Sequence, residues 1–239
     1  MALFAAKSYP IPIVMDYPLT TYENLGNDLG SDILLSNAAI SGDIDAMDLA
    51  LRNGAQNKNE ALKTSAEHGN MNAIKLLIRF GADDVGGAMY WAALRGHRVL
   101  LEYLLSLDDT LKNCALFAAS SAGHIDCFDL LVEYGADDWS RAFCVACLNG
   151  HLYIIKKISL ITKTNIINST IEWNRGFINA CSRGRLNVVR WMCDQRTCSI
   201  DWVWGVQAAR NGGYTECANL CIKFGASLGY IDVKFAVSK

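Results

Sequence analysis

The sequence has few prolines, and their position limits where helices can form. All three of them, Pro10, Pro12 and Pro18, lie near the N-terminus. A proline fixes φ, removes a backbone donor and disfavours helix in the residue before it. We therefore expect residues 1–31 to be an extended N-terminal capping segment that covers the apolar face of the next unit.

The chain also lacks an excess of one charge. It has 22 Lys and Arg residues against 24 Asp and Glu residues, which gives a formal net charge of −2. This balance creates no broad field that attracts nucleic acid or an anionic membrane surface. We expect neither as a partner.

Long apolar runs are missing as well. No run approaches the roughly 18 apolar residues of a spanning helix, and the first residues lack a basic region followed by an apolar core. The composition, 51% hydrophobic and 19% charged, is far from that of a disordered chain. We expect a folded cytoplasmic protein.

Motifs for catalysis are absent too, with one candidate left open. The sequence has no phosphate-binding glycine loop, nucleophile elbow or pair of catalytic carboxylates, so we predict no enzyme, no cofactor and no metal. Cys144, Cys147 and His151 leave the alternative of a thiol-dependent or metal-dependent enzyme, or a redox protein. Cys147, however, occupies a position that Ala66 and Ala93 fill elsewhere, which favours a packing role. Most of the nine cysteines likewise replace small or aliphatic residues.

What the sequence does contain is a repeat. Glycines recur at spacings of 27, 27, 27, 27, 34 and 29 residues, namely Gly42, Gly69, Gly96, Gly123, Gly150, Gly184 and Gly213. An apolar residue stands seven positions before each glycine and a small one stands four before it. Mostly apolar residues follow five and eight positions after it. This pattern predicts a short helix, a hinge at the glycine and a second amphipathic helix.

One such unit cannot bury its apolar face alone, so the units must stack. We predict an all-α solenoid of about seven helix-turn-helix pairs over residues 32–226. Residues 157–174 contain about seven extra residues and many β-branched side chains, so an irregular segment is expected there. Residues 227–239 would form a C-terminal capping half-repeat.

The repeat resembles that of the ankyrin family. The family pattern A-A-x-x-G-H-x-x-x-x-x-x-L-L-x-x-G-A-D is matched at Ala92-Ala93 with Gly96-His97, and over residues 119–137. The period of 27 is shorter than the family's usual 33 or so, and the Thr-Pro-Leu-His opening is missing. The resemblance implies reduced or absent β-hairpin fingers. It also implies a scaffold without chemistry whose first helices bind another protein.

The missing fingers and cysteine-rich helices look similar to ankyrin-like proteins of large cytoplasmic DNA viruses. That resemblance implies a host-directed factor that acts in the host cytoplasm, binds a signalling protein and modulates innate defence. A self-assembling structural unit that joins copies through its tryptophan-rich end is the further alternative. The oligomeric state is left open.

Candidate partner-binding residues lie on the first helices. Trp91 stands five residues before its glycine, where other units carry Thr64 and Asn179, and we expect this position to face solvent. Arg95 and Arg183 directly precede their glycines. Trp and Arg are enriched at the centres of protein interfaces, so we predict partner binding by these five residues.

Other conspicuous side chains have simpler interpretations. Core filling is the default for four tryptophans near the irregular junction, with a partner surface as the alternative: Trp173, Trp191, Trp202 and Trp204. Three histidines directly follow a hinge glycine and are expected to hydrogen-bond the neighbouring loop: His97, His124 and His151. Three aspartate pairs are expected to cap the next helix, or to form an acidic edge for a basic segment: 83–84, 108–109 and 137–138.

Overall fold

The computed structural model describes residues 27–162, 170–195, 200–227 and 229. These residues form fourteen helices and no strand, which confirms the predicted all-α fold of helix pairs without β-hairpin fingers. The helices are α1 (Asn27–Ser41), α2 (Ile44–Arg52), α3 (Lys58–Glu67), α4 (Met71–Arg79), α5 (Val85–Arg95), α6 (Arg98–Leu107), α7 (Lys112–Ala122), α8 (Ile125–Glu133), α9 (Trp139–Asn149), α10 (Leu152–Ile161), α11 (Thr170–Ser182), α12 (Leu186–Gln195), α13 (Trp202–Asn211) and α14 (Thr215–Ser227).

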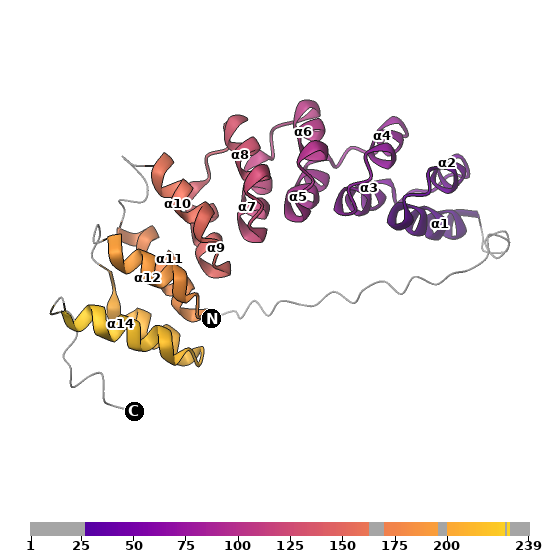
Figure 1. Cartoon of the computed structure of the whole chain (residues 1–239). Helices are drawn as coiled ribbons and strands as arrows, with labels where there is room; N and C mark the ends of the chain where they lie inside the picture. The colour runs from indigo at the N-terminus through magenta and orange to yellow at the C-terminus, as the bar shows by residue number, and fades with distance from the viewer. Residues whose placement is uncertain (1–26, 163–169, 196–199, 228, 230–239) are drawn as a thin grey trace.

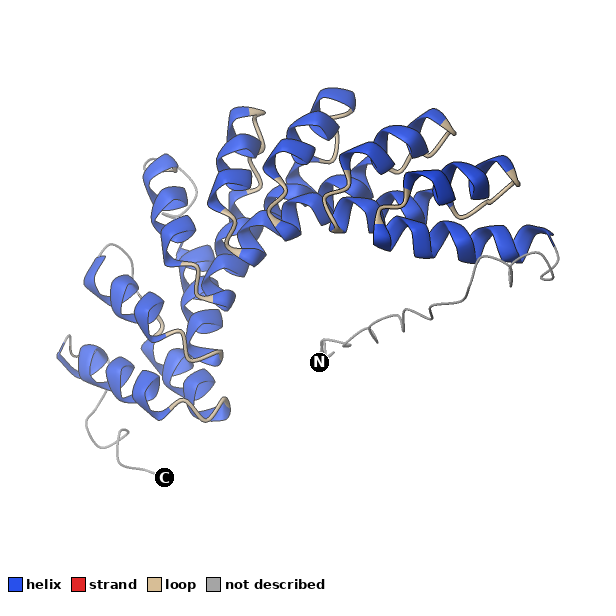
Figure 2. Ribbon diagram, turned by 45° about the vertical axis from the view of Figure 1, so that its right-hand side comes forward, coloured by secondary structure: helices blue, strands red, loops and turns tan. Residues whose placement is uncertain are grey.

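The helices form two rows along an arch (Figures 1 and 2). The odd-numbered helices, which are the first of each pair, make the inner row, and the even-numbered helices make the outer row. Successive inner helices pack on one another more extensively than successive outer helices do. Small side chains at their interfaces allow this close approach, and the inner row is therefore the shorter side of the arch.

The hinge between the two helices of a pair is a glycine in the left-handed conformation. Gly96 and Gly150 end α5 and α9 with φ of 80° and 89°. Residues with a Cβ rarely adopt this conformation, whereas glycine adopts it at little cost. The chain reverses within two residues, so α6 and α10 pack back on the preceding helix.

A continuous core lies between the two rows. It runs from Leu35 in α1 to Cys221 in α14, and each unit adds a layer of fully buried side chains such as Leu62 with Ile74 and Leu77. No helix within the described ranges is long and apolar enough to cross a membrane.

The first helix begins before the predicted boundary at residue 32. Helix α1 includes residues 27–31, which the sequence analysis placed in the capping segment; the last proline, Pro18, is too far away to prevent helix there. The rest of that segment lies outside the described residues, as do 163–169 of the irregular junction and most of 227–239. Helices α9 and α11 pack together, so the inner row continues across the junction.

The later units contain matched large and small residues. Position eight before the hinge glycine is alanine in α3, α5, α7 and α9, but glycine at Gly176 in α11 and Gly205 in α13. A Cβ on Gly176 would lie 2.5 Å from Cε1 of Phe143 in α9. A Cβ on Gly205 would collide with Phe177 in the same way. The bulky phenylalanine of one unit thus fits only against the bare backbone of the next.

We expect Gly176→Ala to lower the free energy of unfolding by about 1–3 kcal/mol, the usual cost of overpacking a core. Adding Phe143→Leu should recover part of that loss, because the leucine leaves room for the new methyl group. Urea titrations of the two single variants and the double variant measure the coupling. Strictly additive losses would show that the two residues are not matched.

Candidate functional site

Each inner helix buries one face and turns the other towards the inside of the arch. In α3 the buried residues are Ala61, Leu62, Ser65 and Ala66, which stand eight, seven, four and three positions before the hinge glycine. The positions two, five, six and nine before the glycine lie on the opposite side. Their side chains are half-buried or exposed in most units. We call the surface formed by these four positions the inner surface.

Aromatic side chains occupy the middle of the inner surface. Tyr90 and Trp91 of α5 meet edge to face, with ring centroids 5.8 Å apart. Phe117 of α7 is half-buried, and the Arg141 guanidinium of α9 lies 5.1 Å from its ring centroid. These contacts hold large apolar groups and a cation in place at the surface.

The predicted site residue Trp91 is half-buried, not solvent-facing as expected. The equivalent residues Ala118 and Val145 are buried, with 0% and 8% of their surface exposed. The close packing of the inner row explains this difference, because the position five before the glycine borders the neighbouring helix.

The other four predicted residues fall into two separate groups. Thr64 is half-buried in α3, and exposed Arg95 in α5 forms an ion pair with Glu67. Asn179 in α11 donates to the Cys144 carbonyl over 3.3 Å, and Arg183 is exposed after α11. Helices α7 and α9 lie between the groups. The structure therefore places these residues along one row and not at one point.

Trp204 does not fill the core, the default expectation, and its exposure agrees with the alternative of a partner surface. Trp173 and Trp202 fill the core as expected, with 3% and 4% exposed, but 62% of Trp204 is exposed. A signal for this was available in the sequence. Trp204 stands nine before its glycine, where Arg141 and Arg175 occupy the two preceding units, and charged residues mark an outward-facing position.

The hinge histidines hydrogen-bond the preceding unit, as predicted. Nε2 of His97 donates to the Glu67 carbonyl over 2.9 Å, and Nε2 of His124 donates to the Leu94 carbonyl over 3.1 Å. Each ring also covers the hinge glycine of the preceding unit: a Cβ on Gly96 would lie 2.7 Å from Nδ1 of His124. His151 likewise donates to the Ser121 carbonyl and covers Gly123. The histidines therefore connect units.

The cysteine pair of the alternative hypothesis lies in the core. Cys144 and Cys147 are 7% and 0% exposed, and burial raises the pKa of both thiols. His151 uses Nε2 for its bond to the Ser121 carbonyl, 2.9 Å away. Within the part of the chain that the structure describes, no three His, Cys, Asp or Glu side chains are placed to hold a metal ion. A buried neutral thiol is a poor nucleophile, and this geometry favours packing.

Two of the three aspartate pairs cap helices as predicted. Asp84 accepts from the Gly87 amide at the start of α5 over 2.8 Å, and Asp138 accepts from the Arg141 amide at the start of α9 over 3.2 Å. The pair at 108–109 differs. Asp108 ends α6 and accepts from the Thr110 amide, because three further residues separate it from α7.

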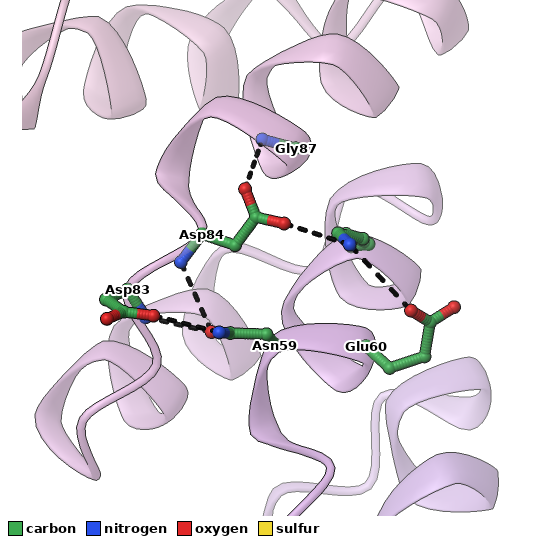
Figure 3. A network of polar contacts seen from close by, with 6 residues as sticks. Asn59, Glu60, Asp83, Asp84 and Gly87 are labelled. Atoms are coloured by element: carbon green, nitrogen blue, oxygen red, sulfur yellow. Dashed lines mark hydrogen bonds and ion pairs between the residues drawn. The ribbon is translucent and has the colours of Figure 1, made fainter.

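The loop before α5 shows how the capping aspartates join neighbouring units (Figure 3). Asn59 of the preceding unit accepts from the Asp83 and Asp84 amides, 2.9 and 3.2 Å away. Lys63 lies 2.9 Å from the Asp84 carboxylate, and this contact lowers the pKa of Asp84. The carboxylate is therefore occupied by its own fold and is not free to form an acidic edge.

Comparison with known proteins supports the fold. Residues 35–113 match a family model described as ankyrin repeats, in three copies. The solved ankyrin repeat domain of human ASB11 has a similar fold, with a TM-score of 0.53 and 20% sequence identity over 69% of this chain and 83% of that one. A comparison with curated proteins gives no match. The chain has the fold of an ankyrin-repeat solenoid, and such repeats generally mediate binding to other proteins.

We expect His124→Ala to lower the free energy of unfolding by about 1–2 kcal/mol, since it removes one hydrogen bond and the cover over Gly96. His68→Ala is the control. His68 is exposed and its Nδ1 bonds to the Thr64 carbonyl within its own unit. The free energy of unfolding of the His68→Ala chain should fall by no more than about 0.5 kcal/mol. Equal losses in urea titrations would contradict a role between units.

We expect the buried thiols to resist Ellman's reagent until the protein unfolds. Burial raises the pKa of Cys127 to about 11, so moving from pH 7 to pH 9 should leave this thiol protonated in the native state. Half-buried Cys114 serves as the internal reference. Mass spectrometry of the labelled peptides reports each site. Rapid native labelling of Cys147 would revive the thiol-enzyme hypothesis.

Proposed function

We propose that the protein is a non-enzymatic scaffold that binds another protein on its inner surface. The observation that carries the proposal is the aromatic centre of that surface, where Tyr90 and Trp91 meet on α5 and Phe117 of the next inner helix lies beside Arg141. Residues of these types supply most of the binding energy in protein interfaces. The stacked inner helices present them on a rigid support.

The arrangement of the aromatic centre supports binding in a second way. The rings of Tyr90 and Trp91 contact each other, and both pack partly against the core. Their rotamers are thus restricted before a partner arrives. Binding then costs less conformational entropy than it would on a flexible loop.

The nature of the partner is the finer part of the proposal. A host signalling protein, bound in the cytoplasm so as to modulate innate defence, accords with the absence of β-hairpin fingers from the described residues and with the cysteine-rich helices. Both features are shared with the viral ankyrin-like proteins that the sequence resembles. Thr64, Arg95, Asn179 and Arg183 would extend the contact area on either side of the aromatic centre.

Affinity capture from host-cell lysate with the Trp91→Ala chain tests the proposal. We expect the amount of the specific partner to fall at least about tenfold, as for a residue at the centre of an interface. Arg95→Ala should have a smaller effect, because its guanidinium already pairs with Glu67. Tyr153→Ala is the matched control, since this aromatic residue of the outer helix α10 is 71% exposed. Equal capture by all four chains would remove the inner surface as the site.

A further inference from the structure

Five of the seven inner helices are poor in acidic residues between their caps, whereas α1 and α3 contain two each. Aspartates are the N-cap residues of α5, α9 and α13. Helices α5, α7, α9 and α13 contain no acidic residue, and α11 contains one, Glu172 in its first turn. The outer helix α8 has three acidic residues by contrast: Asp126, Asp129 and Glu133. The basic residues of the five inner helices are Arg95, Lys112, Arg141, Arg175 and Arg210.

Two of these cations lie in line with the exposed tryptophan. Arg141, Arg175 and Trp204 all stand nine residues before their hinge glycine, on α9, α11 and α13. These three helices pack in succession, and packed helix axes are about 8–10 Å apart. We call this row the Arg-Trp line.

The three residues differ in how free they are to bind a partner. Arg141 is partly neutralised by Asp138, whose carboxylate lies 3.4 Å away. Arg175 is exposed and forms no ion pair with any described residue. Trp204 is 62% exposed, as expected for an interface anchor and not for a core residue. Arg175 and Trp204 are therefore the stronger binding groups.

One apolar side chain lies beside the line. The positions six before the glycine carry buried Cys144 in α9, half-buried Ile178 in α11 and exposed Gln207 in α13. A partner lying along the line would thus meet cations and one large ring on one side and Ile178 on the other. A segment that offers carboxylates together with apolar side chains matches this surface.

We propose that the Arg-Trp line binds an extended acidic segment of the partner protein. This inference rests on the proposed function and specifies the chemistry of the partner at one part of the inner surface. Carboxylates of the segment pair with Arg175 and Arg141, where guanidinium groups can donate two parallel hydrogen bonds. An apolar side chain of the segment packs on Trp204. In the extended polyproline II conformation a chain advances about 3.1 Å per residue with three residues per turn, so every third side chain points the same way and matches the spacing of the inner helices.

A peptide selection on the full chain tests this proposal. The library displays about twelve random residues, enough to span three inner helices in extended form. We expect a consensus with Asp or Glu and an apolar residue three positions away. Fluorescence anisotropy of a labelled consensus peptide should then show a loss of at least about tenfold in affinity for Arg175→Glu and for Trp204→Ala.

Matched variants control for fold and for general charge. Arg190→Glu changes the same charge on the outer helix α12, where Arg190 is exposed, and Tyr153→Ala removes an exposed ring from α10. Both should bind the peptide as the unchanged chain does. Arg175→Gln removes the charge but keeps much of the side-chain stem, so it should weaken binding without disturbing the helix. It therefore tests the charge even if the charge reversal in Arg175→Glu disturbs the helix.

Four outcomes would overturn the proposal: a neutral or basic consensus, no consensus, affinity unchanged by both Arg175 substitutions and Trp204→Ala, or concentration-dependent self-association that Trp204→Ala abolishes. Binding of double-stranded DNA or phosphatidylserine vesicles that Arg175→Glu removes would assign the line to a different polyanion. If Trp91→Ala still abolishes partner capture in any of these cases, the proposed function stands and only the acidic segment is wrong. If substitutions at neither Trp91 nor the Arg-Trp line change binding, both proposals fail.

Discussion

Six of the seven hinge glycines, all but Gly213, lie under a side chain of the next unit, and the assembly of the arch depends on this contact. The rings of His97 and His124 cover Gly69 and Gly96 and also bond to a carbonyl of the preceding unit. Beyond the irregular junction Arg185 covers Gly150, and its Nε donates to the Leu148 carbonyl over 3.0 Å. A side chain at the glycine would obstruct the ring as well as strain the hinge. The hinge glycine thus allows both the chain reversal within a unit and the close contact with the next unit.

The inner surface follows from the same close stacking. Inner helices can approach closely because they meet through small residues, and their remaining side is left open along the inside of the arch. Large side chains on that side, such as Trp91 and Trp204, cannot all be buried by neighbours of this size. The surface is therefore a product of the repeat, while its chemistry is set by single residues that differ from unit to unit.

The sequence predicts the repeat much better than the site. The phase of the glycines, the bonds of His97 and the caps of Asp84 follow from local rules that act within one unit or between two adjacent ones. Exposure on the inner surface depends on how closely two helices approach, which a single unit does not reveal. Trp91 was for this reason expected to be more open than it is. The exposure of Trp204 follows from its position nine before the glycine and not from the tryptophans that surround it in the sequence.

The pairing of Phe143 with Gly176 has a consequence for how such an array can change in length. Solenoids grow when a unit is duplicated, provided that each copy fits the unit before it. If the unit that carries Ala142 and Phe143 were duplicated, the second copy would place an alanine methyl group at the position of Gly176. That methyl group would collide with the phenylalanine ring of the first copy. The units with alanine and leucine at these positions face no such obstacle. The array can thus lengthen among its early members, while the order of its later members is fixed.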